Sequence, residues 1–196
     1  MNKAVFLDRD GVINEIVYHK EMGILDSPAN TGEFKILPDV GKALNKFHKL
    51  GFKVIIISNQ PGIAKDKFTL KIFEEVKNKM KNELAKTDSF VDAEYYCLHH
   101  PEGKNKDYTK VCDCRKPKPG LIIKAAEEHD IDLANSWMIG DGVTDVKAGK
   151  NAGCKTIFIG RMKCDLCNLF EDKNAKPDFI ASNLYKASFI IEKEVR

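Results

Sequence analysis

Two aspartates, one residue apart, end a short apolar segment near the start of the chain, "AVFLDRDGVIN". The segment is short and rich in residues that favour β-structure, which predicts a buried strand running into Asp8 and Asp10. Carboxylates so close together repel each other and lose solvation at a strand end. Acidic residues and glycine are also common where a strand simply turns into a loop, so this stretch by itself leaves both interpretations open.

Two more polar clusters follow apolar segments later in the chain. "SNQPG" comes after "VIII", and "GDGVTD" comes after "WMI". Ligands bind outside the carboxyl ends of the strands in an open parallel sheet, so we expect the three clusters to meet at one edge. There, Asp8 and Asp141 would offer the hard oxygen ligands that suit Mg²⁺, together with waters and a substrate phosphate.

These residue types fit phosphoryl transfer. Once a cation offsets the repulsion, Asp8 can attack phosphorus as a nucleophile and form an aspartyl phosphate. Asp10 can protonate the leaving alkoxide and later deprotonate the attacking water. Ser58 and the backbone amide of Asn59 can bind phosphoryl oxygens.

The remaining negative charge calls for a positioned cation, because phosphoryl transfer relies on electrostatic stabilisation. The segment "CRKPKPG" at 114–120 offers Arg115, Lys116 and Lys118. A lysine in such a loop is ordinarily just solvated. Here two prolines stiffen the backbone beside a predicted metal site, so we expect a fixed cation.

That metal site is predicted from cysteines and histidines. "CLH" and "CDC" give Cys-x-His, twelve residues, then Cys-x-Cys. Cys97, His99, Cys112 and Cys114 form a complete structural zinc set, with His100 as the rival imidazole. The alternative is core or free cysteines near a surface histidine. The polar loop between the pairs cannot build a core of its own, so a metal would explain its order.

The elements that must position these residues alternate between strand and helix. Strands are predicted at 3–8, 53–58, 93–98, 136–140 and 155–160, with helices at 38–50, 69–86, 120–129, 143–152 and after Asn183. This alternation predicts right-handed crossovers and a mainly parallel sheet covered on both faces, an α/β fold with three α/β/α layers. The long loops at 11–37 and 99–118 are candidates for function.

Composition limits the class of protein. A chain of 196 residues with 43% hydrophobic and 31% charged content fits one globular domain. A net charge of +3 and no basic arm argue against a nucleic-acid partner. No apolar run reaches membrane-spanning length and no signal peptide opens the chain, so we expect a cytoplasmic protein without a membrane partner. Without an apolar surface stripe, we expect a monomer.

Four motifs in order, "FLDRDGVIN", "SNQPGIA", "CLHHPEG…VCDCRKPKPG" and "IGDGVTD", resemble the haloacid dehalogenase-like (HAD) phosphatase superfamily. More narrowly, they resemble its small zinc-loop branch of D-glycero-D-manno-heptose 1,7-bisphosphate 7-phosphatases and histidinol-phosphate phosphatases. The resemblance covers roughly residues 3 to 160. It implies a Rossmann-like sandwich without a large cap domain, formed as one domain over 1–196 with a zinc loop at about 97–116.

The resemblance also implies roles for individual residues. Asp8 would be the nucleophile, and Asp10 the general acid/base. Ser58, Asn59, Arg115 and Lys116 would bind the phosphoryl group and substrate. Mg²⁺ would be held by Asp8, Asp10 through its carbonyl, and Asp141, with Asp145 supporting them; structural Zn²⁺ would be held by Cys97, His99, Cys112 and Cys114.

The twelve-residue gap in the zinc loop favours the heptose phosphatases, because the histidinol-phosphate enzymes of this type have a shorter gap. The substrate would then be a small sugar phosphate. A phospho-aspartate signalling module and a non-catalytic zinc module are alternatives of other classes. Asp10 argues against the first and the three polar clusters against the second. The segment 18–34 resembles the family only loosely, and Cys164 and Cys167 are interpreted as surface cysteines on a variable loop.

Overall fold

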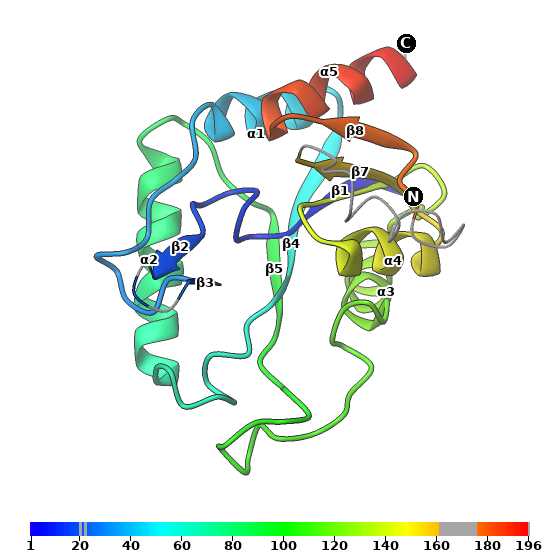
Figure 1. Cartoon of the computed structure of the whole chain (residues 1–196). Helices are drawn as coiled ribbons and strands as arrows, with labels where there is room; N and C mark the ends of the chain where they lie inside the picture. The colour runs from blue at the N-terminus through cyan, green and yellow to red at the C-terminus, as the bar shows by residue number, and fades with distance from the viewer. Residues whose placement is uncertain (20, 22, 161–175, 196) are drawn as a thin grey trace.

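A six-stranded parallel sheet forms the centre of the molecule (Figure 1). The computed structural model describes residues 1–19, 21, 23–160 and 176–195. The sheet consists of β1 (Lys3–Leu7), β4 (Phe52–Asn59), β5 (Ala93–Cys97), β6 (Trp137–Gly140), β7 (Lys155–Ile159) and β8 (Phe179–Ala181), in the order β5-β4-β1-β6-β7-β8. The helices are α1 (Val40–Lys49), α2 (Leu70–Ala85), α3 (Gly120–His129), α4 (Val143–Ala152) and α5 (Leu184–Glu194). The predicted mainly parallel sheet is confirmed.

Helices cover both faces of the sheet, which confirms the predicted three layers (Figure 1). Successive side chains of a strand point to opposite faces. In β1, Val5 and Leu7 pack with side chains of α1, α2 and α5, whereas Ala4 and Phe6 pack with α3 and α4. Right-handed crossovers account for this division, because helices change face when the chain reverses its direction across the sheet.

That reversal occurs between β1 and β6. The chain passes from β1 through β4 to β5 on one side, and then returns to β6 on the other side of β1. Leu7 at the end of β1 is aligned with Ile56 in β4 and Ile139 in β6. The residues after these three neighbouring strands therefore lie together at the switch point, where open α/β sheets bind ligands.

The sequence-based boundaries needed two corrections. The first helix begins at Val40 rather than at residue 38, because Asp39 takes a left-handed conformation with φ of 61°. The predicted loop at 11–37 contains an antiparallel hairpin of β2 (Val17–His19) and β3 (Ile24–Asp26). Strands of three residues are too short to show a period of two, so the pattern carried no signal for them.

Several smaller predictions can also be compared with the structure. Cys154, Trp137 and Met138 are buried, as the apolar stretches that contain them predict. Cys164 and Cys167 lie outside the described residues. Among the residues described, no helix combines the length and the apolar character that crossing a bilayer requires.

Candidate active site

Three aspartates meet at the carboxyl edge of the sheet. Asp8 directly follows β1 and donates its backbone N–H to Ile139 O at 3.0 Å, and Asp141 follows β6. Carboxylate oxygens of Asp8, Asp141 and Asp145 lie within 4.8 Å of one another, close enough to hold one metal ion. Gly11 leaves room for the Asp141 carboxylate in this cluster: its φ is +78°, and a Cβ at position 11 would lie 2.0 Å from Asp141 Oδ2.

Lys116 is the cation among these carboxylates. Its ammonium lies 3.0 Å from Asp8 Oδ1 and 2.5 Å from Asp145 Oδ1, and it donates to the Ile57 carbonyl at 2.9 Å. The lysine side chain is only 2% exposed. Of the cations that the sequence offered, Lys118 points elsewhere and pairs with exposed Asp113. The three acceptors fix the Lys116 ammonium beside Asp8.

Burial and charge shift the pKa values of this cluster. Burial, with the nearby Asp8 and Asp145 charges, raises the pKa of Asp141 to about 7. Burial raises the pKa of Asp145 to about 6, against the opposing effect of Lys116. For Lys116, burial acts to lower the pKa, but the charges of Asp145 and Asp8 outweigh it and leave the pKa raised. The cluster therefore carries excess negative charge that one cation does not neutralise, as a metal-binding site requires.

Asp10 is surrounded by hydrogen-bond donors. Asp10 Oδ1 accepts from Asn14 Nδ2 at 2.8 Å, and Asp10 Oδ2 accepts from Gln60 Nε2 at 2.6 Å and Ser27 Oγ at 2.9 Å. The Arg9 guanidinium, which is buried, donates to both oxygens. Burial acts to raise the pKa of Asp10, but Arg9 and these donors outweigh it and lower the pKa.

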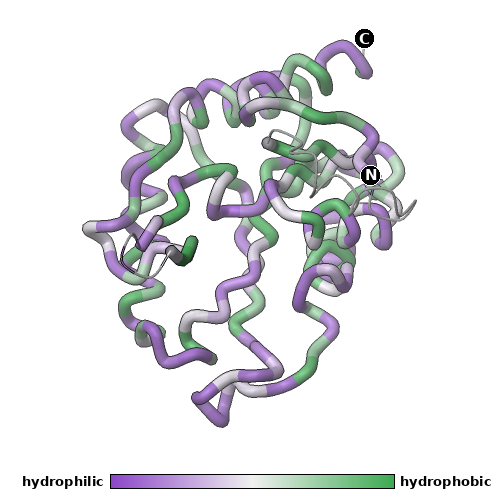
Figure 2. Tube along the Cα trace, viewed as in Figure 1, coloured by the Kyte–Doolittle hydropathy of each residue, from purple (hydrophilic) through white to green (hydrophobic). Residues whose placement is uncertain are grey.

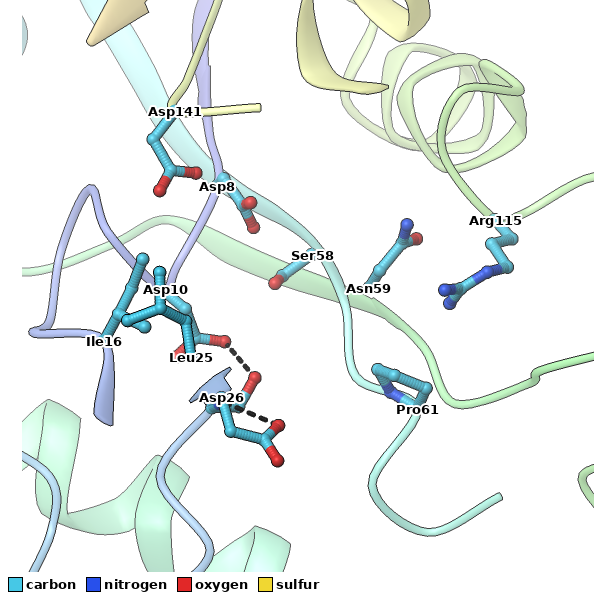
Figure 3. Close-up of a pocket in the computed structure, with 11 residues that line it drawn as sticks. Asp8, Asp10, Ile16, Leu25, Asp26, Ser58, Asn59, Pro61, Arg115 and Asp141 are labelled. Carbon is cyan, nitrogen blue, oxygen red and sulfur yellow. Dashed lines mark hydrogen bonds between the residues drawn. The ribbon is translucent and has the colours of Figure 1, made fainter. Parts of the chain in front are cut away.

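A polar pocket of about 280 Å³ opens over these side chains (Figure 3). In the close-up, Asp8, Asp10 and Asp141 lie on one side of it, and Arg115 lies on the other. The pocket is lined by Asp8, Asp10, Ile16, Leu25, Asp26, Ser27, Ser58, Asn59, Pro61, Arg115 and Asp141. Such a lining suits a small, charged ligand.

Asn59 reaches Lys116 with its side chain. Asn59 Oδ1 accepts from the Lys116 backbone N–H at 3.0 Å, and Asn59 Nδ2 donates to the Lys116 carbonyl at 3.1 Å. The amide group therefore holds the lysine segment in place. Arg115 donates to the His99 carbonyl at 3.3 Å, which ties it to the cysteine-containing loop.

The four zinc ligands predicted from the sequence lie together. Cys97 Sγ, Cys112 Sγ and Cys114 Sγ are 3.1–3.6 Å apart, and His99 Nδ1 is 3.4 Å from Cys114 Sγ. Tetrahedral zinc with Zn–S bonds of about 2.3 Å needs sulfurs about 3.8 Å apart, close to this spacing. Burial raises the pKa of the Cys97 thiol, so a metal is needed to keep it as a thiolate.

His100 does not belong to this cluster among the residues described; its Nδ1 instead accepts from the Glu102 N–H at 3.1 Å. The loop between the two ligand pairs is mainly hydrophilic along its length (Figure 2). Two of its backbone N–H groups, those of Lys104 and Asn105, donate to the Ala64 carbonyl at 2.6 and 3.0 Å. A loop so poor in apolar side chains fits a metal ion as its anchor.

The side chains that surround Asp10 were not predicted from the sequence. Arg9 and Gln60 lie within the quoted motifs, and their burial could have been suspected because each adjoins a predicted strand end. Ser27 carried no signal, since it follows the hairpin that the pattern did not reveal. The site residues that the sequence did predict lie at the same edge of the sheet or in the adjoining loop.

Known proteins similar to this chain identify its family. A family model described as HAD-hydrolase-like matches residues 113–187. The D-glycero-beta-D-manno-heptose-1,7-bisphosphate 7-phosphatase of Escherichia coli K12 is 40% identical over 156 residues, 79% of this chain and 78% of that protein. The chain belongs to the heptose-bisphosphate phosphatase family of HAD-like hydrolases. It is therefore an enzyme, a phosphatase.

Other members of this phosphatase family agree. The Haemophilus influenzae Rd enzyme of the same name is 41% identical over 155 residues, 79% of either chain. The crystal structure of D,D-heptose 1,7-bisphosphate phosphatase from B. bronchiseptica, complexed with magnesium and phosphate, superposes with a TM-score of 0.79 and 27% identity. That likeness covers 98% of this chain and 99% of the other.

Proposed function

We propose that this phosphatase removes the 7-phosphate of D-glycero-β-D-manno-heptose 1,7-bisphosphate by way of a phosphorylated Asp8. One observation carries the proposal: Asp8, Asp10 and Asp141 line the same pocket as Ser58, Asn59 and Arg115. The named activity of relatives that are 40% and 41% identical supports the substrate. A substrate with two phosphates also fits a pocket with carboxylates at one side and Arg115 at the other.

Asp8 is the nucleophile in this proposal. Its carboxylate attacks the phosphorus of the 7-phosphate, and the bond to the sugar oxygen breaks. Because the pKa of Asp10 is lowered, Asp10 acts as the acid only in those molecules in which its carboxyl carries a proton, and that proton passes to the sugar oxygen. The resulting carboxylate then takes a proton from the water that hydrolyses the aspartyl phosphate. Lys116, 3.0 Å from Asp8, stabilises the charge that collects on the transferring group.

Two metal ions belong to the proposal. The carboxylates of Asp8 and Asp141 lie close enough to hold Mg²⁺, and the cluster of three cysteines and His99 fits structural Zn²⁺. The Asp10 carbonyl would be a further Mg²⁺ ligand, as the family resemblance implies. Bound Mg²⁺ would neutralise charge on the phosphoryl oxygens. Asp145 takes no ligand role here because Lys116 and the Gly142 N–H already engage its carboxylate. It supports Lys116 instead.

Phosphate release in the presence of Mg²⁺ tests the proposal. The substrates are both anomers of D-glycero-D-manno-heptose 1,7-bisphosphate, histidinol phosphate and fructose 1,6-bisphosphate. We expect the highest kcat/KM for the β anomer. The Asp8→Asn variant should lose turnover with an unchanged circular dichroism spectrum, because it removes the nucleophile and hardly alters shape. Preference for histidinol phosphate would refute the substrate, and an active Asp8→Asn variant would refute the mechanism.

A further inference from the structure

The β2–β3 hairpin reaches the proposed acid/base through one residue. Ser27 directly follows β3, and its hydroxyl donates to Asp10 Oδ2 at 2.9 Å. Leu25, Asp26 and Ser27 all line the pocket that holds Asp8 and Asp10. The hairpin segment therefore forms part of the pocket lining and also contacts the Asp10 carboxyl through Ser27.

The other three partners of Asp10 belong to the sheet edge itself. Arg9 and Asn14 lie in the loop after β1, and Gln60 directly follows β4. They also hold one another, since Arg9 donates to Gln60 Oε1 at 2.8 Å. All three approach Asp10 with N–H groups, which only donate, whereas the Ser27 hydroxyl both donates and accepts. Ser27 thus differs from the rest in its origin and in its chemistry.

The hairpin holds Ser27 in place through charged contacts. The Ser27 backbone N–H donates to Asp26 Oδ1 at 2.9 Å, one of the bonds drawn in Figure 3. Asp26 forms an ion pair with Lys67, which lies in the turn after β4. The position of the Ser27 hydroxyl therefore depends on the packing of the hairpin against the turn that follows β4.

We propose that Ser27 is a positioning residue that holds the Asp10 carboxyl in the orientation needed to protonate the leaving sugar oxygen. The inference rests on the proposed function, because it assigns a support to the acid/base of that reaction. It gives the hairpin a role in turnover beyond shaping the pocket. Ser27 should therefore affect the rate only for substrates whose leaving oxygen must receive a proton as it departs.

Leaving groups of different basicity separate this role from a general effect on the pocket. An alkoxide needs a proton as it departs, and a positioned acid contributes about 10²–10⁴-fold to such a step. A 4-nitrophenolate is stable enough to depart without one. Single-turnover release, measured with enzyme in excess, reports the first chemical step for both. The alkyl substrate is the heptose bisphosphate, or the alkyl phosphate of the panel that wild type hydrolyses fastest.

We expect Ser27→Ala to slow release from the alkyl phosphate about tenfold, a part of that contribution. Release of 4-nitrophenol and the KM should stay within about twofold, because Asp10 keeps its other donors. Ser27→Thr, which retains the hydroxyl, should restore the alkyl rate. Tyr18→Ala on the same hairpin, exposed and outside the pocket lining, should match wild type.

Equal loss with both substrates in Ser27→Ala would show damage to the pocket and overturn the inference. So would an unchanged alkyl rate, or failure of Ser27→Thr to restore it. None of these outcomes affects the proposed function while wild type remains active. If wild type hydrolyses no phosphomonoester of the panel, the proposed function itself fails.

Discussion

Replacing Lys116 by Met removes a buried cation from the cluster of Asp8, Asp141 and Asp145. The ammonium contacts Asp8 and Asp145, and side chains of both Lys116 and Asp145 are 2% exposed. Methionine has a similar length and fills the space without supplying charge. The variant therefore tests whether the lysine is an electrostatic requirement of the fold as well as a proposed catalytic group.

The expected loss of unfolding free energy at pH 8 is about 3–5 kcal/mol, the range for breaking a buried ion pair from one side. Lowering the pH should shrink the loss. Asp145 has a raised pKa of about 6 even beside the lysine, and the variant should raise it further. The folded state then binds a proton that the unfolded state, with an ordinary carboxyl, does not bind at pH 5, so stability increases as pH falls. Each added pKa unit recovers about 1.4 kcal/mol.

Urea denaturation at pH 8 and pH 5 measures these quantities. Mg²⁺ is left out, because a cation between Asp8 and Asp141 would replace part of the lost charge. The Asp145→Asn variant and the Lys116→Met/Asp145→Asn double variant complete the cycle. The double variant should be about 2 kcal/mol more stable than Lys116→Met, since the unpaired buried charge is gone. A single variant within 1 kcal/mol of wild type, or additive effects in the cycle, would contradict the electrostatic reasoning.

Two further variants test the metal sites. Cys112→Ser should lower bound zinc from one ion per chain to near zero, speed proteolysis within 99–118 and reduce activity. The control Cys154→Ser, which lies outside the cluster, should keep its zinc. A full zinc content in Cys112→Ser would rule out Cys112 as a ligand. Gly11→Ala should weaken Mg²⁺ binding at least tenfold in calorimetric titration, because its Cβ would lie 2.0 Å from Asp141 Oδ2. Gly153→Ala is the matched control, with φ of +83° and nothing within 4 Å; equal Mg²⁺ affinity in both variants would refute the steric argument.

The site residues at the sheet edge could be predicted from the sequence because their residue types and positions after apolar strands are local features of the chain. Each of the three polar clusters directly follows an apolar strand, and parallel strands bring their carboxyl ends to one side. Asp8, Ser58 and Asp141 could therefore be grouped before the structure was known. The zinc ligands were readable for a related reason: thiolates and imidazole in two close pairs are an uncommon combination with few other uses.

The contacts that hold these site residues in place could not be predicted from the sequence, because they join segments that are distant in the chain. The family resemblance already singled out Lys116 rather than Lys118, but the contacts that fix it come from the structure: the Ile57 carbonyl of β4 accepts from Lys116, whereas Lys118 pairs with exposed Asp113. Likewise, the amide of Asn59 holds the backbone of Lys116 rather than a ligand. Neither contact has a sequence period or spacing that could reveal it.

The sequence by itself determined the α/β fold, the edge of the sheet where chemistry occurs and the residue types found there. Hydrophobic pattern and residue chemistry are local properties, so the chain displays them directly. Only the tertiary structure decided that Ser27 and Gln60 hold Asp10 and that Asp145 holds Lys116. These pairings depend on how loops from separate strands pack in three dimensions, and burial then sets their charges and pKa values.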